Sequence, residues 1–108
     1  MERTDFARAN AVLAFVDTQV GYFRLVDDPE AALQRALETA RKAVELEPHF
    51  GPNFAALGEA LEATGAGTGA SRAWRRAERA AQAAVERGEP DAVEWLEEAR
   101  EALRRLGR

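Results

Sequence analysis

Few side chains in this sequence of 108 residues could perform acid–base or nucleophilic chemistry. His49 is the only histidine, and the chain contains no cysteine, which excludes disulfides, thiolate metal ligands and thiol nucleophiles. A hydrolytic triad needs a nucleophile and an oriented base within hydrogen-bond reach of each other. No serine motif accompanies His49, so we interpret it as a surface residue of a turn and predict that the chain is not an enzyme.

The glycine-rich segment around Gly65, Gly67 and Gly69 is the part of the chain that most resembles a phosphate-binding loop. A Walker loop needs a lysine before its Ser/Thr, and the dinucleotide fingerprint has a different spacing after a strand. Neither pattern is present, and the many carboxylates form no Glu-x-x-His pair or calcium loop. We therefore expect no cofactor, no metal and no small-molecule substrate. Gly65 is the expected C-cap of one helix, and Thr68 or Ser71 the N-cap of the next.

A basic stripe is the main charged feature, formed by Arg72, Arg75, Arg76 and Arg79. This spacing places all of them on one helical face, about opposite Trp74. Such a face could bind nucleic acid or an acidic partner. However, no aromatic residue interleaves with the arginines, and 15 basic against 19 acidic residues give a net charge of −4. We interpret the stripe as a solvated surface, and nucleic-acid binding remains an alternative function.

Helical periodicity and helix-breaking residues predict an all-α domain of five helices. They are expected over about 5–26, 29–47, 53–64, 70–87 and 91–106. Asp28 is the expected N-cap of the second helix, with Pro29 at its first position, and Pro48 ends that helix. The length fits a single domain spanning residues 1–108.

Apolar residues at steps of three and four mark the face that each helix buries. In the first helix these residues are Phe6, Ala9, Leu13, Val16, Val20 and Phe23, and in the second Ala32, Ala36, Leu37, Ala40, Ala43, Val44 and Leu46. The three later helices are expected to bury Phe54, Leu57, Gly58 and Leu61, then Ala70, Trp74, Ala77, Ala81 and Ala84, then Ala92, Leu96, Ala99, Leu103 and Leu106. Trp95 is assigned either to the core or to an exposed terminal face.

Apolar stretches are too short for a membrane protein. The longest covers 11–16, whereas a spanning helix needs about 20 residues. The N-terminus also lacks the order of basic, apolar and small residues that marks a signal peptide. We expect a soluble, cytoplasmic protein.

Two segments resemble the tetratricopeptide repeat. Residues 40–48, which read ARKAVELEP, resemble the close of such a repeat, and residues 54–61, FAALGEAL, resemble its opening. Gly65, Ala70, Trp74 and Ala77 continue in register. The second repeat lacks the closing proline, and the first is about four residues too long, which adds about one helical turn.

The resemblance implies a right-handed stack of antiparallel helix pairs, over about 5–47 and 53–87, closed by a capping helix over about 91–106. In this family the first helices of the pairs line a groove that binds protein segments. The corresponding groove residues here are Asp17, Gly21, Arg24, Ala55, Glu59 and Glu62. The carboxylate clamp of one subtype is not matched, and the glutamates would favour a basic segment. The resemblance thus implies a non-enzymatic protein-interaction module.

A second apolar face on the first helix suggests an alternative function. Phe15 and Tyr22 are seven residues apart and lie away from the main apolar stripe. A terminal helix of a stack has a neighbour on one side only, so this face could dock on a second chain. Homo-oligomerisation, as a dimer or a scaffold, is therefore the alternative that this face supports.

Overall fold

The computed structural model describes residues 28–107, which form four helices and no strand. The helices are α2 (Pro29–Leu46), α3 (Gly51–Ala63), α4 (Gly67–Glu86) and α5 (Ala92–Arg105). Over these residues the all-helical class is confirmed, and each helix lies close to its predicted position. The helix expected over 5–26 lies outside the described residues, as do Phe15, Asp17, Gly21, Tyr22 and Arg24.

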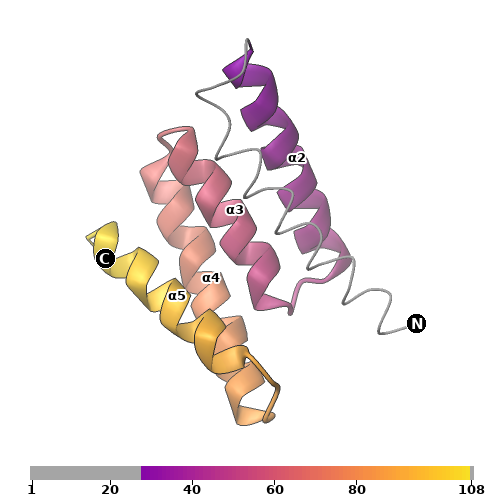
Figure 1. Cartoon of the computed structure of the whole chain (residues 1–108), viewed down its shortest axis with the longest axis vertical. Coiled ribbons are helices and arrows are strands. Elements are labelled where there is room, and N and C mark those ends of the chain that lie inside the picture. The colour runs from indigo at the N-terminus through magenta and orange to yellow at the C-terminus, as the bar shows by residue number, and fades with distance from the viewer. Residues whose placement is uncertain (1–27, 108) are drawn as a thin grey trace.

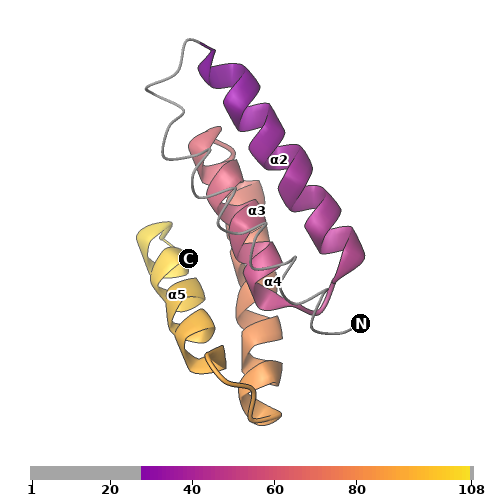
Figure 2. The same ribbon diagram turned by 45° about the vertical axis from the view of Figure 1, so that its right-hand side comes forward.

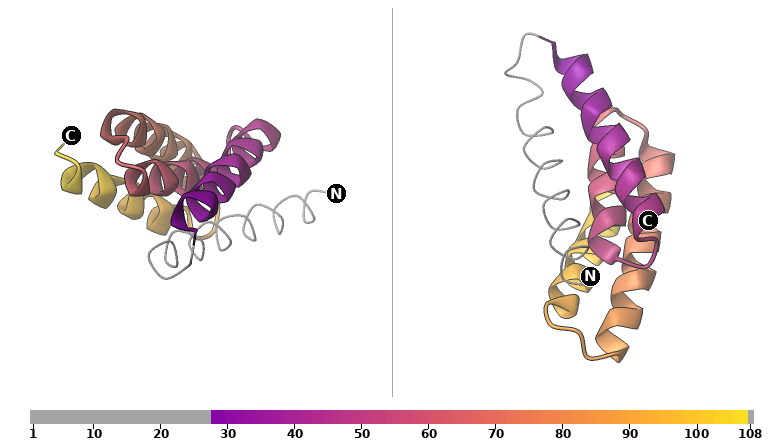
Figure 3. Two further views of the ribbon diagram at one scale, coloured as in Figure 1. Left: turned by 90° about the horizontal axis from the view of Figure 1, so that it is seen from above. Right: turned by 90° about the vertical axis from the view of Figure 1, so that its right-hand side faces the viewer.

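Successive helices run antiparallel, so that the chain passes up and down from α2 to α5 (Figure 1). The closest packing is between α3 and α4, followed by α4 with α5 and α2 with α3. Figure 2 shows α2 and α5 at opposite edges of this arrangement. Figure 3 gives two further views of these helices, and α2 and α5 make no contact with each other.

The ends of α2 and α3 follow the predicted capping chemistry. The Oδ1 atom of Asp28 accepts a hydrogen bond of 3.1 Å from the Ala31 backbone N–H, and Pro29 occupies the first turn of α2. Thr64 is the C-cap residue of α3, and Gly65 follows it with a φ of +82°, a conformation that favours glycine. The predicted start of α2 is confirmed, whereas the C-cap of α3 lies one residue before the predicted Gly65.

The predicted cap of α4 is wrong. The helix begins at Gly67, with Ala66 as an N-cap residue that makes no side-chain hydrogen bond. Thr68 and Ser71 therefore lie inside the helix. The reason is the tight turn at Gly65, in which the Ala66 N–H bonds back to the Leu61 carbonyl at 3.0 Å and the next helix starts at once.

Two apolar clusters hold the helices together. One joins α2 to α3 and consists of Ala36, Leu37, Ala40, Ala56 and Ala60. The other joins α3, α4 and α5 and consists of Phe54, Ala55, Ala70, Trp74, Ala77, Ala99, Ala102 and Leu103. Leu61 packs against both clusters. Alanine predominates in both clusters, which allows the helix backbones to approach closely.

The predicted buried faces are largely confirmed. All five predicted residues of α4 are buried, and of the five predicted for the last helix only Leu106, the C-cap residue of α5, is partly exposed. The prediction that Leu46 is buried is wrong, because 64% of its surface is exposed. It follows Val44 by two positions, which turns its side chain by about 200° around the helix and away from α3.

Candidate interaction surfaces

The four arginines of the predicted stripe are all exposed on α4. Trp74 is 4% exposed and faces the core from the same helix. The prediction of a shared basic face is therefore confirmed. The arginines differ, however, in what surrounds them, and this difference divides the stripe into two pairs.

Arg76 lies over an aromatic ring that belongs to another helix. Its guanidinium carbon Cζ is 5.0 Å from the centroid of the Phe54 ring, within the range of a cation–π interaction. As predicted, no aromatic residue of α4 itself interleaves with the stripe. The ring comes from α3, and helical spacing within α4 gives no signal of such a neighbour.

A surface depression, which we call the arginine hollow, adjoins this contact and has a volume of about 280 Å³. It lies between the α2–α3 turn, α3 and α4, and its lining includes Pro48, His49, Phe54, Arg76, Arg79 and Arg87. Arg72 and Arg75 lie outside it. The stripe thus has one pair of arginines at the hollow and one pair away from it. Among the described residues, no acidic side chain contributes to the lining.

The arginines of the hollow have different ionic partners. The Nε of Arg87 donates to Oε2 of Glu89 at 2.7 Å, and the same carboxylate forms an ion pair with Nη2 of Arg87. Among residues 28–107, no carboxylate pairs with Arg76 or Arg79. The positive charge of these two residues is therefore not neutralised by a neighbouring acid in this part of the chain.

A second depression, the apolar hollow, adjoins the first and has a volume of about 390 Å³. Its apolar lining includes Leu46, Phe50 and Trp95, its two acidic lining residues are Glu47 and Glu89, and it shares Pro48, His49 and Arg87 with the arginine hollow. The Phe50 and Trp95 rings meet edge to face, with centroids 5.3 Å apart. Trp95 is half-buried, so it lies between its two predicted environments. The exposed Leu46 side chain gives this hollow an apolar wall.

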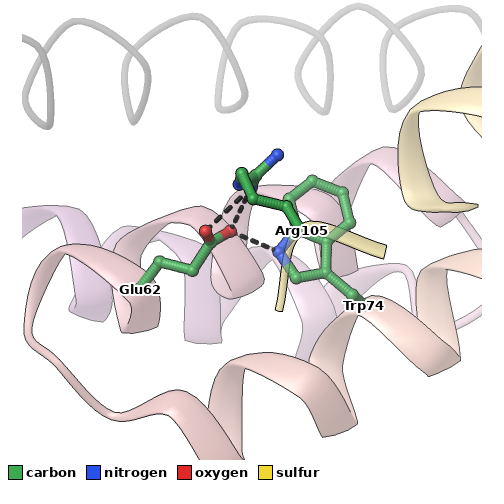
Figure 4. Close-up of polar contacts among 3 residues, drawn as sticks. All are labelled: Glu62, Trp74 and Arg105. Atoms are coloured by element: carbon green, nitrogen blue, oxygen red, sulfur yellow. Dashed lines mark hydrogen bonds and ion pairs between the residues drawn. The ribbon is translucent and has the colours of Figure 1, made fainter. Parts of the chain in front are cut away.

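The predicted groove residues of α3 lie elsewhere. Ala55 is 6% exposed and packs in the cluster that includes α5 residues, whereas Glu59 and Glu62 are half-buried. Figure 4 shows that the Glu62 carboxylate receives hydrogen bonds from two other helices. Trp74 Nε1 donates at 2.7 Å, and Arg105 Nη2 donates to the two carboxylate oxygens at 2.8 and 2.9 Å. Glu62 therefore already links α3, α4 and α5.

The remaining observations concern His49, metal ions and membranes. His49 is exposed in the α2–α3 turn, as predicted. Within residues 28–107, no group of three or more His, Asp or Glu side chains is placed to hold a metal ion. None of the helices described is both long enough and apolar enough to cross a membrane. Comparisons with known protein families, curated proteins and solved structures found no significant match to this chain.

Proposed function

We propose that this chain is a non-enzymatic protein-interaction module that binds a segment of a partner protein in a groove between its helices. The observation that carries the proposal is the pair of adjoining hollows at the α2–α3 turn, with Leu46 64% exposed beside them. An exposed leucine beside a concave surface is the kind of feature that a partner side chain covers.

The resemblance to tetratricopeptide repeats supports the same function. The antiparallel order of α2, α3 and α4 is compatible with stacked helix pairs, in which a rigid scaffold presents a surface to an extended segment. Gly58, one of the residues that carry the resemblance, lies at the contact between α3 and α4. The right-handed repeat stack is part of this proposal.

The adjoining hollows are a better candidate surface than the groove expected on α3. A partner at Glu62 would compete with Arg105, and Ala55 offers little surface. Leu46, in contrast, has no comparable internal contact to lose. We therefore place the binding surface at the hollows and retain Glu59 and Glu62 as a second region for a partner to reach.

Peptide display on the full chain tests this proposal. Random linear peptides are selected on the immobilised chain, and the affinity of each selected peptide is measured in solution by calorimetry. We expect saturable binding of one peptide per chain. Leu46→Gln should weaken it about tenfold, because a buried leucine contributes about 1.5–3 kcal/mol.

Val93→Gln is the matched control, since Val93 is also exposed, at 56%, but lies outside both hollows. This variant should bind the selected peptides as the unmodified chain does. Failure to select any saturable ligand would contradict the proposed function. Equal weakening by the two variants would contradict the assignment of the surface.

Light scattering distinguishes this function from homo-oligomerisation through Phe15 and Tyr22. Molar mass is measured over a wide concentration range, with and without a selected peptide. A monomer that binds peptide supports the proposed function. A dimer that persists on dilution and binds no peptide would instead favour the alternative.

A further inference from the structure

We propose that the arginine hollow binds the carboxylates of an acidic segment of a partner protein, while an apolar side chain of that segment occupies the apolar hollow. This inference rests on the proposed function and adds the chemistry of the partner to it. Its basis is the charge of one hollow, the apolar wall of the other and the lining residues that the two share.

Charge complementarity identifies the acidic part of the segment. Arg76, Arg79 and Arg87 all line the hollow, and no carboxylate from residues 28–107 does. The surface is therefore locally positive on a chain whose net charge is −4. Guanidinium groups match carboxylates geometrically, because each can donate two parallel hydrogen bonds. The contact with Phe54 restricts Arg76, which lowers the entropy that binding would otherwise cost.

Continuity between the hollows identifies the apolar part. Pro48, His49 and Arg87 line both depressions, so one segment that leaves the arginines enters the apolar hollow without crossing another element. Leu46 then provides a contact for a leucine-sized side chain. A segment with bulky apolar residues among acidic ones can place its carboxylates at the arginines and an apolar side chain in the apolar hollow at the same time.

The same observations favour a protein over a nucleic acid. Single-stranded nucleic acids are held by aromatic faces on which bases stack. Phe54 and Phe50 are only 4% and 8% exposed, and Arg76 already lies over the Phe54 ring. An exposed leucine gives a phosphate backbone nothing to bind. Nucleic-acid binding is therefore treated as an outcome of the experiment.

Fluorescence anisotropy with defined probes tests the inference on the full chain. The probe is a labelled 12-residue peptide made of four Glu-Glu-Leu units, and its controls carry Gln for Glu or Ser for Leu. We expect saturable binding of the probe and about tenfold weaker binding of each control peptide, since each lacks one of the two contacts.

The two arginine pairs of α4 supply matched variants. Arg76→Gln with Arg79→Gln should weaken the probe about tenfold, because charged hydrogen bonds are lost. Arg72→Gln with Arg75→Gln changes the net charge equally but outside the hollow, so it should weaken the probe by no more than about twofold. All four side chains are exposed, and circular dichroism checks that each double variant keeps its helices.

A substitution at Glu89 should have the opposite effect and strengthen probe binding. Glu89→Gln removes the carboxylate that pairs with Arg87, and we expect it to strengthen probe binding by about twofold to threefold. Glu94→Gln, which alters an exposed carboxylate on α5 outside both hollows, should have little effect. Weaker binding in the Glu89 variant would contradict the inference.

Four further results would overturn it. If both double arginine variants weakened probe binding equally, the attraction would be non-specific. If neither variant changed probe binding, the peptide would bind elsewhere on the chain. A labelled 12-nucleotide oligouridylate could bind more tightly than the peptide probe. If both double arginine variants weakened that binding, and if it fell steeply with salt, the hollow would be a nucleic-acid surface. If peptides selected by display depend on Leu46 but not on Arg76 and Arg79, the proposed function stands and this inference alone fails.

Discussion

The indole ring of Trp74 lies directly against the backbone of Gly58. A Cβ atom built at position 58 would be 2.6 Å from Nε1 and 2.7 Å from Cδ1 of that ring, closer than real Cβ atoms come. The ring is 4% exposed and packs in the cluster that joins three helices, so it has little room to move. The close contact of α3 with α4 therefore requires glycine at position 58.

We expect Gly58→Ala to lower the free energy of unfolding by about 1–2 kcal/mol. Alanine favours a helix over glycine by about 1 kcal/mol, but overpacking a close contact costs about 1–3 kcal/mol, and here the steric cost should be larger. Urea unfolding followed by circular dichroism measures the difference.

Gly69→Ala is the control for this prediction. Gly69 is also helical, and the nearest atom to its Cβ would be Leu61 Cδ1 at 3.6 Å, an ordinary contact. The free energy of unfolding of this variant should rise by up to about 1 kcal/mol from helix propensity alone. A Gly58→Ala variant as stable as Gly69→Ala would contradict the steric argument.

Local patterns in the sequence were enough to predict most of the described fold. Asp28 and Gly65 have side-chain and backbone properties that suit helix ends, and both act there. The spacing of Ala70, Trp74 and Ala77 likewise predicts the buried face of α4, because helical geometry fixes which residues share a side.

The features that could not be predicted depend on neighbours distant in the sequence. The Phe54 ring beside Arg76 comes from another helix, and the arginine hollow exists only when the α2–α3 turn lies beside α4. Leu46 was predicted to belong to the buried face of the second helix, yet 64% of its surface is exposed. Apolar character alone does not reveal which side of a helix end has a neighbour.

Glu62 should matter more to stability through Trp74 than through Arg105. Glu62→Ala leaves the Trp74 N–H without its 2.7 Å partner, and a buried unsatisfied donor costs about 1–3 kcal/mol. Arg105→Gln removes an ion pair whose arginine side chain is 55% exposed, which is worth at most about 1 kcal/mol. Urea unfolding of both variants gives the order of the two effects.

The indole N–H resonance of Trp74 provides a direct check. It should shift in Glu62→Ala and move little in Arg105→Gln, because only the first change removes the acceptor. If Arg105→Gln were the more destabilising variant, the exposed ion pair and not the buried hydrogen bond would hold α5 in place.

Asn53 holds the end of α2 and should be sensitive to a nearly isosteric change. It is 0% exposed, and its Nδ2 donates to the Ala43 carbonyl at 3.0 Å and to the Glu47 carbonyl at 3.3 Å. Asn53→Ala removes these bonds and should cost about 2 kcal/mol. Asn53→Asp should cost more, about 3 kcal/mol or above, because a buried carboxylate would face two carbonyl oxygens.

The order of the two Asn53 variants is the decisive observation. Thermal and urea unfolding are measured at neutral pH, with the unmodified chain in parallel. The Asn53→Asp variant should be less stable than the Asn53→Ala variant. An aspartate variant as stable as the unmodified chain would mean that the amide donor is not needed at this turn.

Ser71 should be a site where a substitution stabilises the fold. Its Oγ is buried and has no hydrogen-bond partner among the described residues, although hydroxyls buried in this way normally find one. Ser71→Ala removes an unsatisfied polar atom and places a better helix former in α4. We expect a gain of about 1 kcal/mol in the free energy of unfolding.

Thr68→Ala separates the two contributions to this gain. Thr68 is exposed on the same helix, so its replacement changes helix propensity without removing a buried hydroxyl, and the gain should be only a few tenths of a kcal/mol, about 0.5 at most. A Ser71→Ala variant that is less stable than the unmodified chain would show that the hydroxyl is bonded in solution. The buried face of α4 beside Leu61 and Trp74 would then contain a polar contact in addition to its apolar packing.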